Sequence, residues 1–214
     1  ALSRSGLVFR GQASLVPGLE HASDLECGPR KSFSGLSFES PMMPVSDGGV
    51  VLKEKDQDFS VTRQHRLSVK RTSNPNDAFS EDINVAYFAA EIKTNLDKTM
   101  FQEAAATAAE LKRSTSSSRC LLVCEWLDMK LISPKLTSID EVIILRRSKR
   151  ISSNIRSQFS NREGRVAQRD WFERFLDEHP LHIDCFHRFV FDLKETFPKH
   201  TDETEDAVIS RGYF

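Results

Sequence analysis

An acid and a lysine stand two residues apart near the middle of the chain, at Glu91 and Lys93. They follow a run rich in Val, Ala, Tyr and Phe that begins at Asn84 and predicts a buried strand. Because side chains alternate faces along a strand, Glu91 and Lys93 should share one face, with Ile92 on the other. A carboxylate beside an ammonium group at the edge of a core could serve metal-dependent chemistry on a phosphate.

A second carboxylate stands upstream at Asp77, within the turn-forming sequence SNPNDA. A hairpin between Asp77 and Glu91 would return both carboxylates to one corner. Since Mg²⁺ prefers one or two carboxylates and keeps several waters, these acids and a phosphate would form a magnesium site. The metal would polarise the phosphate and acidify a bound water, while Lys93 would orient that water or stabilise the transition state. Asp82 is the alternative to Asp77 as a metal ligand.

A Glu and a Lys two residues apart on a strand are usually a solvent-exposed pair, so the spacing alone is weak support for catalysis. Three features strengthen the catalytic interpretation. The pair ends an unusually apolar strand, Asp77 stands at a workable range, and a helix is predicted directly afterwards, over residues 97–112. Asp97 suits the N-cap of that helix, its interior is rich in Ala, and it carries Gln102 on its first turns.

The elements around this segment define the expected fold. A strand, a helix and a further strand follow one another, which indicates a crossover unit in a mixed sheet. The fold class is therefore expected to be α/β, with a central mixed β-sheet flanked by helices. Further strands are expected at residues 49–53, 59–70, 120–129 and 140–145, and amphipathic helices at residues 168–178 and 183–197.

Composition divides the 214 residues into three stretches. Residues 1–48 are rich in Ser, Gly and Pro and are expected to be irregular. Residues 49–200 are expected to form one folded domain, which includes a basic, Ser-rich segment at 146–165 that suggests a loop. Residues 201–214 are expected to be an acidic tail.

The net charge of −1 argues mildly against a nucleic-acid-binding protein, unless the cationic contacts are concentrated in one place. The densest basic cluster is predicted to contact DNA phosphates, although a loop that merely faces solvent is the alternative. Its members are Arg146, Arg147, Lys149, Arg150 and Arg156.

Other chemistries find little support. Four cysteines form no CxxC pair, which suggests free thiols in a cytoplasmic, prokaryotic protein, and no apolar run reaches the roughly 20 residues that span a bilayer. The cluster His179, His182, Cys185 and His187 matches no common zinc spacing. The sequence also has no Ser/His/Asp motif and no Gly-rich phosphate loop.

Residues Glu91 to Ala104, EIKTNLDKTMFQEA, resemble the catalytic segment of type II restriction endonucleases related to DdeI and BbvCI. These are PD-(D/E)xK nucleases, and the resemblance covers residues 74–112, about a fifth of the chain. It implies a restriction-endonuclease-like fold, Mg²⁺ and DNA targets built around CTNAG. By this likeness Asp77, Glu91 and Lys93 carry the motif, with Asn76 where a strict motif has Pro, and Gln102 braces the site.

The sequence therefore predicts a subunit of a magnesium-dependent type II restriction endonuclease that hydrolyses double-stranded DNA at specific sites. The resemblance further implies a homodimer, or a heterodimer with a second nuclease subunit. Two alternatives remain open: a non-catalytic DNA-binding or assembly subunit, and a repair or recombination nuclease of the same fold. A complete set of Asp, Glu and Lys favours the enzyme.

Overall fold

The computed structural model describes residues 11–13, 20, 23–197, 209–210 and 212, which contain a six-stranded sheet in the order β1 to β6. Strands β1 to β4 are antiparallel neighbours, whereas β4, β5 and β6 are parallel. The expected α/β class with a mixed sheet is therefore confirmed. The strands are β1 (Gly11–Gln12), β2 (Glu26–Phe38), β3 (Val50–Arg71), β4 (Asn74–Leu96), β5 (Arg119–Leu127) and β6 (Glu141–Ile144).

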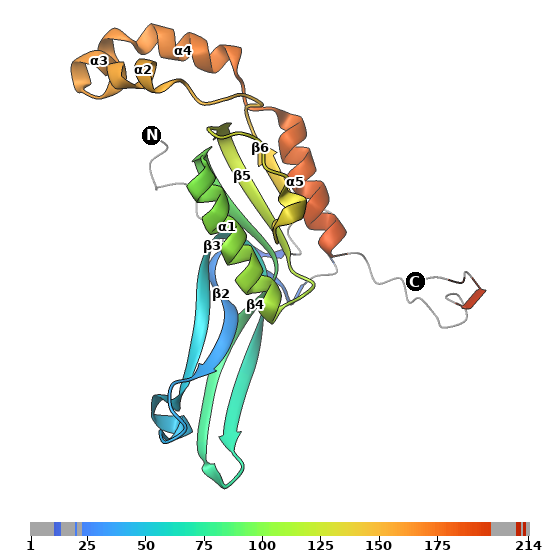
Figure 1. Cartoon of the computed structure of the whole chain (residues 1–214). Helices are drawn as coiled ribbons and strands as arrows, with labels where there is room; N and C mark the ends of the chain where they lie inside the picture. The colour runs from blue at the N-terminus through green and yellow to red at the C-terminus, as the bar shows by residue number, and fades with distance from the viewer. Residues whose placement is uncertain (1–10, 14–19, 21–22, 198–208, 211, 213–214) are drawn as a thin grey trace.

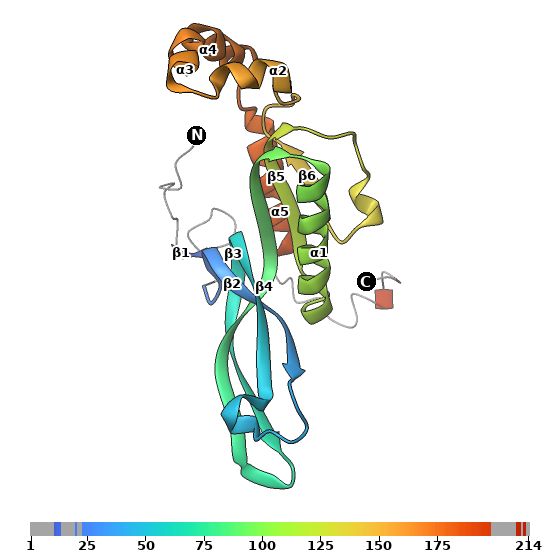
Figure 2. The same ribbon diagram turned by 60° about the vertical axis from the view of Figure 1, so that its left-hand side comes forward.

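Helices cover both faces of the parallel part of this sheet (Figures 1 and 2). The longer helices are α1 (Lys98–Ser114), α4 (Arg169–Glu178) and α5 (Ile183–Thr196), and the shorter ones are α2 (Ser153–Arg156) and α3 (Arg162–Ala167). Single turns form η2 (Val45–Gly49), η3 (Pro134–Leu136) and η4 (Ser157–Phe159). None of the helices among the described residues is both long and apolar enough to span a membrane.

Helix α1 forms the crossover between β4 and β5, as the sequence predicts. The Asp97 side chain accepts a hydrogen bond from the Met100 backbone nitrogen at 2.9 Å, so the expected N-cap is confirmed. The buried side of the helix carries small residues that let it lie close to the sheet. Its buried residues are Phe101, Ala104, Ala108 and Leu111, which pack with Ala89, Cys120, Leu122 and Cys124.

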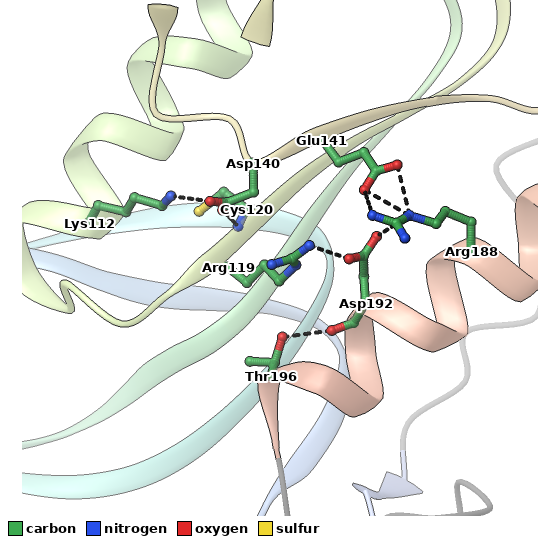
Figure 3. A network of polar contacts seen from close by, with 8 residues as sticks. All are labelled: Lys112, Arg119, Cys120, Asp140, Glu141, Arg188, Asp192 and Thr196. Atoms are coloured by element: carbon green, nitrogen blue, oxygen red, sulfur yellow. Dashed lines mark hydrogen bonds and ion pairs between the residues drawn. The ribbon is translucent and has the colours of Figure 1, made fainter. Parts of the chain in front are cut away.

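Helix α5 covers the opposite face, where Phe59, Phe88 and Phe189 meet edge to face. An ion-pair network fastens the helix to the sheet (Figure 3). The fully buried Asp192 binds Arg119 of β5, and Arg188 lies 2.6 Å from the Glu141 carboxylate. Burial raises the pKa of Asp192, whereas the hydrogen bond from Arg188 lowers the pKa of Glu141.

Strand β3 belongs to two hairpins whose tips meet. Arg71 donates to the Met43 carbonyl oxygen at 2.6 Å, and the Ser46 backbone nitrogen donates to Asp77 at 2.8 Å. A straight strand of 22 residues would be roughly 70 Å long and would keep these tips apart. The strand therefore bends, with register shifts near Gly28 and Thr62, and the two hairpins form one arm that extends from the core (Figure 2).

Helices α2, α3 and α4 with η4 form a helical cap, residues 153–178, at the end of the molecule opposite the arm (Figure 1). A stack of aromatic rings joins this cap to the sheet. Trp171 stacks on Phe175 at 5.5 Å between ring centroids, and Phe175 stacks on Trp126 of β5 at 5.2 Å. The helical cap is therefore held against the carboxyl end of β5.

Three expectations about secondary structure were wrong. Residues 26–38 are not irregular but form β2, whose inner positions include the buried serines Ser32 and Ser34 and therefore show no apolar alternation. The turn expected at 73–78 is confined to Thr72 and Ser73. Residues 146–165 contain helical turns as well as loop, and most of the expected tail, 201–214, lies outside the described residues.

Candidate active site

Glu91 and Lys93 lie together near the carboxyl end of β4. The Lys93 Nζ atom is 2.7 Å from the Glu91 Oε1 atom, and the side chains are 23% and 28% exposed. Both therefore project from the same side of the strand, as the alternation of a strand requires. The pair is half-buried, yet it still reaches solvent, as a site for a large substrate must.

Asp58 of β3 supplies a second carboxylate beside this pair. Its neighbour Phe59 is paired with Ala90, the residue before Glu91, in the antiparallel register. The Asp58 Oδ2 atom accepts a hydrogen bond from the Ile92 backbone nitrogen at 2.8 Å. A carboxylate thus lies directly across from the Glu-x-Lys segment. Sequence reasoning missed it, because only the strand register shows which acid of β3 faces Glu91.

Asp77 lies far from this group, and its expected position was wrong. Strand β4 runs without a turn from Asn74 to Leu96, so the expected hairpin between Asp77 and Glu91 is absent from it. The 14 residue steps between them span roughly 45 Å of extended chain. Asp77 is instead buried at the tip of the arm, where hydrogen bonds from Ser46 lower its carboxyl pKa and Arg71 forms an ion pair at 3.3 Å.

The other two candidates near the motif are also displaced from it. Asp82 lies on the arm and forms a two-point ion pair with Arg66 at 2.6 and 2.8 Å. Gln102 is exposed on α1. At 100° per residue it lies on nearly the opposite side of the helix from Ala104, which borders Glu91. The structure therefore does not bring Gln102 to the Glu91 carboxylate.

Two further residues border Glu91 that sequence reasoning did not single out. Gln57 and Thr107 line a cavity of about 10 Å³ together with Glu91. Gln57 is 5% exposed, and its Nε2 atom has no hydrogen-bond partner among the described residues. The space is close to that of one water molecule, which could join the amide to the carboxylate. Gln57 thus lies beside Glu91 on the wall of the same small cavity.

The predicted phosphate-contacting residues have different environments. Arg146 is only 13% exposed, with Glu125 at 2.7 Å, the His179 carbonyl oxygen at 2.6 Å and the Trp126 ring beneath it. These contacts engage the guanidinium group of Arg146 inside the fold and leave it less available to a phosphate than the other predicted residues. Arg147 pairs with Asp184 near the surface, and Lys149 is exposed.

Arg150 and Arg156 meet at one carboxylate, the Asp128 Oδ2 atom, at 3.1 and 3.3 Å. Each side chain is about one-third exposed. One carboxylate shared by two guanidinium groups leaves an excess of positive charge. These two arginines therefore keep the capacity to bind an anion.

The carboxylates fit a hard divalent cation better than they fit zinc. Asp58 and Glu91 offer oxygen donors from adjacent strands, and one or two carboxylates completed by water and phosphate suit Mg²⁺. Within the described residues no three His, Cys, Asp or Glu side chains converge as a metal-binding group. A metal at this site would therefore depend on water and substrate for most of its ligands.

Glu-x-Lys lies on a strand that crosses over through a helix into a parallel neighbour, which is the arrangement expected of the nuclease class that the sequence resembles. The family model described as the Bpu10I restriction endonuclease matches residues 7–214, and the chain belongs to that family. The family is one of site-specific deoxyribonucleases, enzymes that generally use divalent metal ions.

The other comparisons give less detail. No curated protein matched the sequence. A solved structure described as the native BbvCI A2B2 tetramer at low resolution matched with a TM-score of 0.46 and 25% identity. The match covers 61% of this chain and 49% of that one, so this chain spans about half the length of its structural relative.

Proposed function

We propose that this protein catalyses magnesium-dependent, site-specific hydrolysis of phosphodiester bonds in double-stranded DNA. The observation that carries the proposal is the Glu91–Lys93 pair on β4 with Asp58 across from it, in a chain of a restriction endonuclease family. The target belongs to the class built around CTNAG, in keeping with the resemblance of residues 91–104.

The chain's own residues have separable roles in this reaction. Glu91 and Asp58 would hold the cation, which supplies polarisation of the phosphate and acidification of a water when it is bound. Lys93 holds the attacking water or stabilises the charge that develops on the phosphate, because its ammonium group is fixed beside Glu91 at 2.7 Å. Gln57 positions the Glu91 carboxylate from the buried side.

The described part of the chain contributes one such group of residues, whereas a duplex has two strands to cut. We therefore propose that the protein acts with a second nuclease subunit, either another copy or a different chain. The four cysteines are free, which supports a reducing, intracellular location.

The test is incubation of the purified protein with mixed plasmid DNA and Mg²⁺, followed by sequencing of the ends. The assay is run alone and with candidate partner subunits. Site-specific ends are expected, and both Glu91→Gln and Lys93→Ala should abolish them. Glu81→Gln and Lys70→Ala are matched controls on the arm and should cut normally.

A full loss of activity in the two controls, or normal cutting by Lys93→Ala, would contradict the assignment. Specific DNA binding without cutting in every partner combination would instead identify a non-catalytic DNA-binding subunit. Cutting without sequence preference would point to a repair or recombination nuclease.

A further inference from the structure

A cleft of about 490 Å³ lies between the helical cap and the carboxyl ends of β4 and β5. Thr94 of β4 forms part of its wall, and Thr94 directly follows Lys93 in the chain. The cleft therefore borders the strand that carries the active-site lysine. Its volume is within the range of small-molecule binding sites.

Aromatic rings form much of the lining. Trp126 of β5, Phe159 of η4 and Phe172 of α4 all border the cleft. Trp126 is only 7% exposed, with Phe175 stacked on it and Arg146 over its ring, so it forms the base of the cleft, whereas Phe172 remains 38% exposed. The exposed ring of Phe172 therefore offers a face on which a flat, unsaturated group can stack.

Four arginines surround these rings: Arg150, Arg156, Arg165 and Arg169. Two carboxylates balance them in part, since Arg150 and Arg156 share Asp128, and Arg169 lies 2.8 Å from Glu173. Arg165 donates to backbone carbonyl oxygens at 3.2 and 3.4 Å. The cleft therefore combines an aromatic lining with an excess of positive charge.

A flat aromatic group joined to an anion is the chemistry of a nucleotide. We propose that the cleft binds one unpaired nucleotide of the DNA substrate, with its base stacked on Phe172 and its phosphate beside the arginines. The inference rests on the proposed function, because the nucleotide belongs to the DNA that the active site cuts. A base inside a paired duplex cannot enter, so binding requires that one nucleotide leaves the helix.

The test compares two short duplexes of the same sequence, one fully paired and one with a single unpaired thymidine in the middle. Binding is measured by fluorescence anisotropy with Ca²⁺ in place of Mg²⁺, so that cleavage is suppressed. The wild-type protein should bind the second duplex about five- to 150-fold more tightly, the range that one base–aromatic stack provides.

Phe172→Ala should remove most of this preference, and Phe172→Tyr should keep it because the ring is retained. Phe186→Ala is the matched control, since Phe186 is 41% exposed on α5 and does not line the cleft. Arg169→Gln should weaken binding to both duplexes and lower the slope of log affinity against log salt by about one.

Equal affinity of the wild type for both duplexes, with plasmid cutting intact, would overturn the proposal for the cleft and leave the proposed function standing. Absence of both DNA binding and cutting would contradict the nucleotide proposal and the proposed function together. If Phe172→Ala changes subunit association in sedimentation while the preference for the unpaired thymidine persists, the cleft is a subunit interface and the nucleotide proposal is wrong.

Discussion

Asp58 and Asp77 can be separated by a pair of isosteric substitutions. Asp58→Asn should reduce Mg²⁺-dependent cleavage by about 100-fold or more, because even partners that only orient metal ligands contribute 10–100-fold to metal affinity or activity. Asp77→Asn should leave the cleavage rate of the folded protein near the wild-type value. The two variants remove the same charge, so the difference isolates position.

The expected difference in cleavage between the two variants follows from where β4 places Asp77 and Glu91. Oxygen ligands of Mg²⁺ lie about 2.1 Å from the ion, so two ligands of one ion are only a few ångströms apart. Asp77 precedes Glu91 by roughly 45 Å of extended chain and binds Ser46 at the tip of the arm, whereas Glu91 lies in the core beside Ala104 of α1. Asp58 instead accepts a hydrogen bond from the residue next to Glu91. Only Asp58 can share an ion with Glu91.

The assay is single-turnover cleavage across a series of Mg²⁺ concentrations, with thermal unfolding measured on the same samples. Asp77→Asn should lower the melting temperature, because Ser46 and Arg71 lose a charged partner at the tip of the arm. A large loss of cleavage in folded Asp77→Asn, with Asp58→Asn active, would refute the assignment of the metal ligand.

Four further outcomes are expected. Arg146→Ala should lower the free energy of unfolding by about 1.5–3 kcal/mol in chemical denaturation, because it leaves Glu125 without its charged partner, and the salt slope of DNA binding should not change. The pKa of Glu141 is lowered in the folded protein, so the stability that its ionised carboxylate contributes is present above the unfolded pKa of about 4.3. This contribution is lost as the pH falls through the folded pKa. Glu141→Gln should therefore flatten the acid limb of a plot of the free energy of unfolding against pH. Burial raises the pKa of Cys124 to about 12, so a thiol reagent at pH 8 should label it only on unfolding, and rapid labelling of the native protein would contradict that burial. EDTA should stop cleavage, Ca²⁺ should restore DNA binding without cutting, and full activity in EDTA would exclude the metal-dependent reaction.

The sequence predicts elements well where one strong local signal defines them. The Ala-rich segment after Asp97 forms α1 with the expected cap, and the apolar runs around Ala89 and Leu122 form neighbouring parallel strands. The prediction of these segments is correct because helix or strand propensity, hydrophobic periodicity and capping residues all indicate the same structure. The Glu91–Lys93 pair follows directly, since strand alternation fixes which side chains share a face.

The partner of that pair could not be predicted in the same way. Asp58 and Asp77 are both acids near strand residues, and only the antiparallel register tells which one faces Glu91. Turn-forming residues around Pro75 suggested a hairpin, yet tertiary contacts extend β4 through them. Similarly, the basic run predicted a solvent-exposed surface, whereas Arg146 is largely buried by its contacts with Glu125 and Trp126. Long-range pairing decided each case.

The ion pair between Arg119 and Asp192 joins residues 73 positions apart in the sequence. This separation affects folding during synthesis of the chain. A ribosome delivers the residues of α1 and β5 long before those of α5. During that interval Phe59 and Phe88 lack the cover that Phe189 provides. The nascent protein therefore carries an exposed apolar sheet face until α5 emerges, and this is the period in which it is most open to aggregation or chaperone binding.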